Sequence, residues 1–92
     1  MDVKLLEIER PPRPASPATV VRILLLVDGQ QDWYEIGIEP MDLKTTATAL
    51  LVPSEPLEDA FRYEQYALHR LLRVVGQDLR GVAVKLPQQI AA

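Results

Sequence analysis

The sequence predicts an α+β protein: a four- to five-stranded, mainly antiparallel sheet packed by one long helix, in the order β-β-β-β-α-β. Two β-branched, apolar runs around an Asp-Gly pair predict a β-hairpin. Apolar residues at helical spacing between residues 55 and 80 predict an amphipathic helix. A length of 92 residues, 48% of them hydrophobic, suits one small domain covering residues 1–92.

Composition excludes several classes of protein. Because the chain has no cysteine, it has no disulfide scaffold, thiolate metal site or cysteine nucleophile. A net charge of −3 does not favour phosphate backbones or anionic membranes. We expect a cytoplasmic protein, since the N-terminal residues do not resemble an export signal and the longest apolar run, Ile23–Val27, cannot cross a bilayer.

The first predicted strand, Val3–Glu9, precedes a proline-rich segment at residues 11–17. This segment holds four of the eight prolines. Proline has no backbone N–H to donate, so the segment cannot form a central strand. We expect it to be a stiff connector.

Residues Thr19–Val27 and Trp33–Ile38 form the predicted hairpin, with residues 29–32 as its loop. Counting outward from a pairing of Asp28 with Trp33 gives an apolar face on which Val27 faces Tyr34, Leu25 faces Ile36 and Ile23 faces Ile38. The opposite face then pairs Leu26 with Glu35, Leu24 with Gly37 and Arg22 with Glu39.

Residues 44–52, bracketed by Pro40 and Pro53, are predicted as a strand, although their alanines would also tolerate a helix. The helix is predicted over Glu55–Arg80, where Pro56 suits the first turn. Gly76 lies within this helix or ends it, with a turn running on to Gly81. Residues 82–86 are predicted as a closing strand, and residues 87–92 as a flexible tail.

Residues with catalytic chemistry do not form a recognisable set. His69 is the only histidine, and no carboxylate lies three or four positions from it. Ser54 lies where a helix cap is its natural role. The acids from Asp28 to Asp32 lack the spacing of a calcium loop, and no phosphate-binding glycine motif occurs. We therefore expect no catalytic residue, metal site, cofactor or small-molecule ligand, and not an enzyme.

Two surfaces are candidates for binding a partner. The first is the other, semi-apolar face of the hairpin, with Trp33, Leu24, Leu26 and Glu35; alternation puts Trp33 on the side away from Tyr34. Either the proline-rich segment covers Trp33, or a second molecule does, or a one-residue register slip buries it and exposes Tyr34.

The second surface is a stripe along the predicted helix. Its spacing places on one side Arg62, Tyr66, His69, Arg70, Arg73, Gln77 and Arg80. The alternative is a solvated helix face whose charges pair locally, such as Glu58 with Arg62.

These surfaces favour a non-catalytic protein–protein interaction module: a small accessory or assembly subunit that binds another protein or an identical subunit as a homodimer. A second hypothesis is a nucleic-acid-associated regulator that uses the basic half of the helix. A third is a small-molecule enzyme whose pocket forms at a dimer interface.

Overall fold

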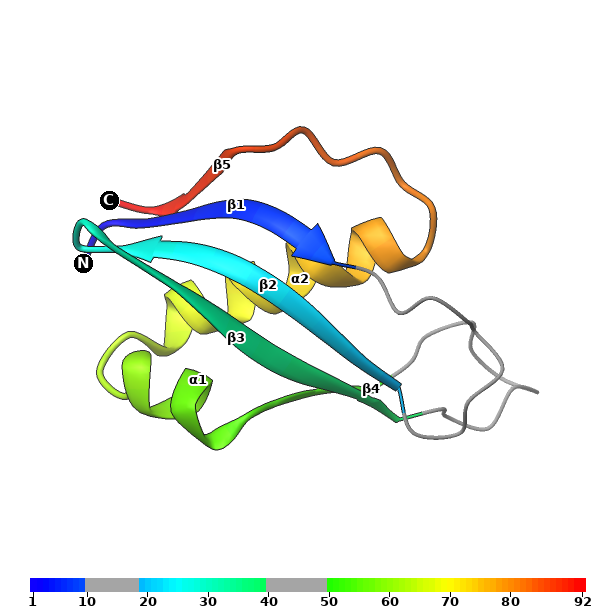
Figure 1. Cartoon of the computed structure of the whole chain (residues 1–92), viewed down its shortest axis with the longest axis horizontal. Coiled ribbons are helices and arrows are strands. Elements are labelled where there is room, and N and C mark those ends of the chain that lie inside the picture. The colour runs from blue at the N-terminus through cyan, green and yellow to red at the C-terminus, as the bar shows by residue number, and fades with distance from the viewer. Residues whose placement is uncertain (10–18, 40–49) are drawn as a thin grey trace.

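The computed structural model describes residues 1–9, 19–39 and 50–92. They form a five-stranded antiparallel sheet in the spatial order β4-β3-β2-β1-β5, with two helices on one face (Figure 1). The predicted α+β class and strand order are confirmed, except that two helices replace one. The elements are β1 Val3–Glu9, β2 Thr19–Val27, β3 Gln30–Glu39, β4 Leu50–Pro53, α1 Glu55–Ala60, α2 Gln65–Leu79 and β5 Gln88–Ala91.

A two-residue turn, Asp28-Gly29, joins β2 to β3, so the expected loop at residues 29–32 is wrong. Asp28 has a φ of 47° and Gly29 a φ of 84°. Positive φ at both central residues is what the tightest hairpin turns require, and an Asp-Gly pair tolerates it. Residues 30–32 therefore extend β3, and every predicted pair is displaced by four residues.

The displacement changes partners but not faces. Leu24 faces Trp33, Arg22 faces Glu35 and Val21 faces Ile36. Since side chains alternate with a period of two, a shift by four leaves each side chain on its predicted side. The turn is also attached to the chain start, because the Asp28 carboxylate accepts the Asp2 backbone N–H at 2.8 Å.

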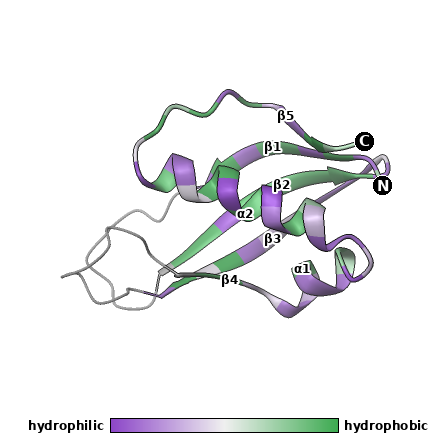
Figure 2. Ribbon diagram, turned by 180° about the vertical axis from the view of Figure 1, so that it is seen from behind, coloured by the Kyte–Doolittle hydropathy of each residue, from purple (hydrophilic) through white to green (hydrophobic). Residues whose placement is uncertain are grey.

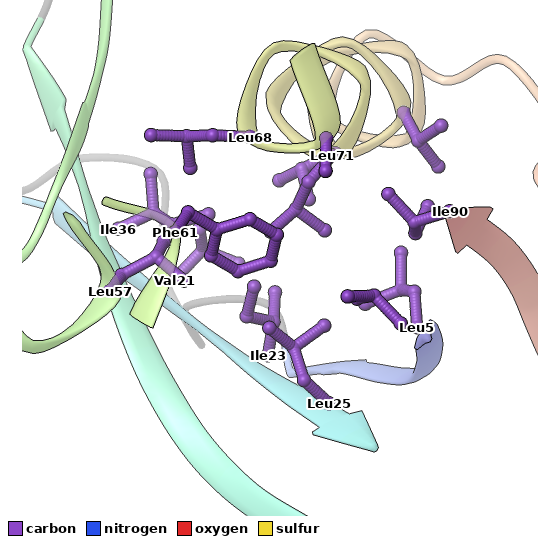
Figure 3. Packing of buried hydrophobic residues seen from close by; sticks show 14 residues of the cluster. Leu5, Val21, Ile23, Leu25, Ile36, Leu57, Phe61, Leu68, Leu71 and Ile90 are labelled. Carbon is purple, nitrogen blue, oxygen red and sulfur yellow. The ribbon is translucent and has the colours of Figure 1, made fainter. Parts of the chain in front are cut away.

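The core lies between the inner face of the sheet and the helices. In Figure 3, Phe61 lies between Val21 and Ile23 of the sheet and Leu71 of α2. Fully buried side chains come from four strands and both helices, which ties every layer to one core. They are Val3, Leu5, Val21, Ile23, Leu25, Ile36, Leu57, Phe61, Leu71, Val75 and Ile90.

The predicted helix is interrupted by a turn at residues 61–64. In a continuous helix, the inward position between Phe61 and Leu68 would fall on Glu64 or Gln65, both polar. Breaking the helix leaves residues 62–66 exposed and avoids burying these groups. Tyr63, in this turn, is 89% exposed as a result.

Helix α2 ends at Leu79 and is followed by a cap that Gly81 completes, whereas Gly76 lies inside the helix. The Gly81 N–H donates to the Asp78 carbonyl and the Val82 N–H to the Gln77 carbonyl, both at 3.0 Å. These two hydrogen bonds together form a Schellman cap, which needs a residue in the left-handed conformation after the helix. Gly81 supplies it with a φ of 88°.

The closing strand is not residues 82–86 but β5, so the prediction of a flexible tail from Pro87 is wrong. β5 pairs with β1, with Val3 opposite Ala91, and Ile90 is fully buried. The Arg70 guanidinium also donates to the Ile90 carbonyl at 3.1 Å. Residues 44–49 of the predicted fourth strand and the proline-rich segment 11–17 lie outside the described residues.

We expect Ile90→Ala to lower the free energy of unfolding by about 2–4 kcal/mol, because it leaves a cavity between β1 and α2. Urea denaturation measures the change. Lys85→Ala, in the exposed stretch before β5, is the matched control and should change stability by less than about 0.5 kcal/mol. Equal effects of the two substitutions would contradict the docking of β5.

The two glycines of the α2 region should respond oppositely to alanine. Gly76→Ala should stabilise by about 0.5–1 kcal/mol, because a Cβ there meets only Leu51 Cδ1 at an ordinary 3.6 Å. Gly81→Ala should destabilise by about 1–2 kcal/mol, because its φ is left-handed. Thermal unfolding of both variants checks the signs, and the same sign for both would refute the assigned helix end.

Candidate functional site

The outer face of the sheet carries exposed apolar side chains. Helix α2 lies behind the sheet in Figure 1 and in front of it in Figure 2, and α1 buries Leu57 in the same core, so the described helices cover the inner face alone. Three large apolar residues of the outer face are open to solvent: Val20 at 44%, Trp33 at 40% and Val52 at 39%.

Trp33 forms the centre of this face together with its neighbours on β2. It lies directly opposite Leu24, which is only 8% exposed although it points away from the main core. The Arg22 guanidinium stacks 4.9 Å from the centre of the indole ring. A nitrogen of the same guanidinium lies 3.6 Å from Glu9 of β1. The indole is therefore held against two residues of β2, one of which is paired in turn with β1, and it still presents a large surface to solvent.

A glycine extends the apolar region toward β4. Val20 pairs with Gly37 on β3, and Gly37 pairs with Val52 on β4. Because Gly37 has no side chain, the two valines flank a low point of the face; a Cβ there would meet the Val52 carbonyl oxygen at 3.6 Å. The apolar residues of the outer face thus come from three strands and lie on both sides of the Arg22–Glu35 pair. We call them together the Trp33 face: Val20, Leu24, Leu26, Trp33 and Val52.

The structure decides one of the alternatives for Trp33. Tyr34 is half-buried on the inner face, opposite Ile23, while Trp33 is exposed on the other side. The register slip that would bury Trp33 is therefore wrong. A covering role for the proline-rich segment lies outside the described residues.

The helix stripe is only partly gathered into one place. Tyr66, His69, Arg70 and Arg73 line a surface hollow on α2. Arg62 lies in the turn before α2 and pairs with Asp59 at 3.1 Å instead of the expected Glu58. Gln77 is half-buried, and Arg80 caps the far end of the helix. The hollow, and not the whole stripe, is the second candidate surface.

The hollow concentrates positive charge. No carboxylate occurs in α2 between Glu64 and Asp78. Within the described parts of the chain, neither Arg73 nor His69 has an ion-pair or hydrogen-bond partner. Arg70 uses one guanidinium nitrogen to bind the Ile90 carbonyl, which leaves its other donors facing solvent.

Other chemistry is sparse in the residues that the structure describes. They contain no group of three or more His, Cys, Asp or Glu side chains arranged to hold a metal ion. Neither described helix is long and apolar enough to cross a membrane. Ser54 occupies the N-cap position of α1, but its buried hydroxyl has no hydrogen-bond partner among the described residues.

Comparison with known proteins gives no relative: the chain matches no protein-family model, and no curated protein or solved structure is significantly similar to it. Its function is therefore inferred from the Trp33 face and the α2 hollow.

Sequence reasoning missed two members of the Trp33 face. Val20 shares the period of Arg22 and Leu24, so strand alternation alone could have placed it there. Val52 could not be placed, because its side depends on how β4 pairs with β3, and no sequence signal set that register.

Tyr34 makes stability depend on alkaline pH. Burial, and then the negative charge of Asp32, raise the pKa of Tyr34 above its usual 10.0. Above pH 10.0 the Tyr34 hydroxyl therefore keeps its proton in the folded protein but loses it in the unfolded chain. The free energy of unfolding is highest below pH 10.0 and declines as the pH rises from there through the raised pKa. Tyr34→Phe should flatten this decline in urea midpoints, whereas Tyr63→Phe, at an exposed site, should leave it unchanged. An unaltered decline in Tyr34→Phe would contradict the assignment.

Proposed function

We propose that this protein is a non-catalytic protein–protein interaction module, a small accessory or assembly subunit, and that the Trp33 face is its principal docking surface. The observation that supports this most is the exposure of Trp33, and of Val20 and Val52 beyond the Arg22–Glu35 pair, on a sheet face that no described helix covers. Exposed large apolar side chains framed by charged residues are typical of sites that bind another molecule. Tryptophan is also among the residues that most often dominate binding energy.

The occupant that we propose is a second copy of this chain. With strands about 4.8 Å apart and about 3.4 Å per residue, the outer face offers roughly 600 Å² per copy. Two such faces would bury about 1,200 Å², at the lower limit of specific interfaces. The face also carries both charge signs, with Lys4 and Arg22 among Glu7, Glu9 and Glu35. A two-fold arrangement can set a cation of each copy against a carboxylate of the other.

The nucleic-acid alternative finds less support. Glu7, Glu9 and Glu35 lie on the outer sheet face and would repel phosphate. On α2, the hollow has Arg70 and Arg73 with Tyr66 as its one aromatic residue, fewer groups than a strand-binding surface uses. The enzyme hypothesis requires a pocket that a second copy completes. None of the described residues has been identified as a catalytic group for such a pocket.

Light scattering after size exclusion, repeated over a dilution series, tests the proposal. The native chain should have twice its 10.3 kDa mass at high concentration. Trp33→Ala should raise the dimer dissociation constant at least about thirtyfold, as expected for a central aromatic anchor. Tyr63→Ala removes an aromatic residue that is even more exposed, from the turn between the helices, and should leave the constant unchanged.

Two results would overturn this assignment. A native chain that is monomeric at every concentration refutes the second copy as occupant. A dimer that tolerates Trp33→Ala refutes the Trp33 face as its interface. Urea denaturation of each variant separates loss of association from loss of folding, since Trp33 is partly exposed and its removal should leave a folded domain.

A further inference from the structure

We infer that the α2 hollow lined by Tyr66, His69, Arg70 and Arg73 binds the carboxylates of an acidic peptide segment from a partner protein. This inference rests on the proposed function, because it gives the interaction module a second kind of ligand, different from its own copy. It also names the chemistry of recognition: charge-assisted hydrogen bonds from two guanidinium groups to side-chain carboxylates.

The donors of the hollow come from adjacent turns of one helix. Arg70 and Arg73 are three residues apart, and His69 is four residues before Arg73, so all three side chains lie on neighbouring positions of the helix surface. Tyr66, 93% exposed, adds a phenolic hydroxyl and an aromatic surface at the N-terminal end of the hollow. A ligand with several acceptor oxygens can therefore contact more than one of these groups at once.

Arg70 is partly fixed in advance. One of its guanidinium nitrogens, NH1, is bound to the Ile90 carbonyl at 3.1 Å, so the side chain is tied to β5 before any ligand arrives. A donor that is already ordered loses less conformational entropy on binding than a free arginine does. The remaining N–H groups of the planar guanidinium match the two oxygens of a carboxylate.

The local charge is the opposite of the overall charge. The whole chain has a net charge of −3, whereas α2 carries two arginines and no carboxylate between Glu64 and Asp78. Arg73 has no partner among the described residues, so an incoming carboxylate would not have to displace an internal ion pair. Charge complementarity therefore favours an acidic segment at this place and disfavours a basic one.

A peptide fits these groups better than a nucleic acid does. A strand of nucleic acid needs cations repeated along its backbone and aromatic surfaces for its bases. Here Arg62 is paired with Asp59, and Arg80 lies at the end of the helix outside the hollow. The remaining donors form a compact group that can bind one or two carboxylate side chains.

The hollow and the Trp33 face lie on opposite layers of the molecule. Figure 2 shows α2 on the side of the sheet that is turned away from the viewer in Figure 1. A dimer formed through the sheet would leave the hollow of each copy open. The two sites can therefore be occupied together and tested separately.

Fluorescence anisotropy with a short, fluorescein-labelled peptide carrying a run of glutamates tests the inference. The native chain should bind it and should bind the same peptide with glutamines at least about tenfold more weakly. Arg73→Gln should weaken binding of the glutamate peptide by about tenfold without loss of stability, because Arg73 makes no described contact that folding needs. Arg80→Gln removes the same charge outside the hollow and should change binding less than about twofold.

The contrary outcomes are distinct. Equal affinity for the glutamate and glutamine peptides would refute carboxylate recognition. Equal weakening by Arg73→Gln and Arg80→Gln would refute a local site and indicate a general effect of charge. Tighter binding of a single-stranded oligonucleotide than of the glutamate peptide would overturn the inference in favour of nucleic acid, and tighter binding of a phosphoserine peptide would overturn it in favour of phosphate.

Failure of this inference can be told apart from failure of the proposed function. Trp33→Ala should abolish dimerisation and leave peptide affinity unchanged, while Arg73→Gln should do the reverse. Loss of both activities in one variant whose urea midpoint is unchanged would contradict the separation of the two surfaces.

Discussion

Asp28 and Gly29 both adopt positive φ angles and form a two-residue turn. This turn sets which residue of β2 pairs with which residue of β3. Because the turn closes directly after Val27, Trp33 comes to lie against Leu24 and beneath the Arg22 guanidinium. A turn one residue longer would reverse the sidedness of β3, bury a tryptophan and expose Ile36. The register of one hairpin therefore determines both the core and the exposed apolar face.

A second constraint is the number of layers. The described helices cover one face of the sheet, and no described helix covers the other. Breaking the helix at residues 61–64 lets Leu57 and Phe61 of one segment and Leu71 of the next reach the same core. The inner face is closed in this way by 21 helical residues (6 in α1 and 15 in α2), and the outer face keeps its apolar side chains in solvent. This asymmetry is the basis of the docking surface that we propose.

Local signals were enough for the fold class, for β1 and β2, and for the side on which each hairpin residue lies. These local signals did not predict the elements whose structure depends on a contact with a distant part of the chain. Residues Gln88–Ala91 contain one large apolar side chain and no strong strand pattern, and only pairing with β1 makes them a strand. Glu64 and Gln65, at an inward position, could have predicted the helix break. The apolar residues at helical spacing on both sides of them favoured a single helix instead. The hollow on α2 could be foreseen as a stripe, whereas its limits depended on Arg62 turning toward Asp59 and Arg70 toward β5.

The pairing of Val3 with Ala91 joins positions near opposite ends of the sequence. Forming it requires closure of almost the whole chain, which carries the largest loop entropy of any contact in the sheet. The β2–β3 hairpin, by contrast, closes through two residues. Such a distribution of contacts raises the contact order and slows folding compared with a helical protein of equal size. Assembly of this sheet should therefore begin at its centre and finish at the β5 edge, so that the strand holding Ile90 is the last to be protected from solvent and the first to open.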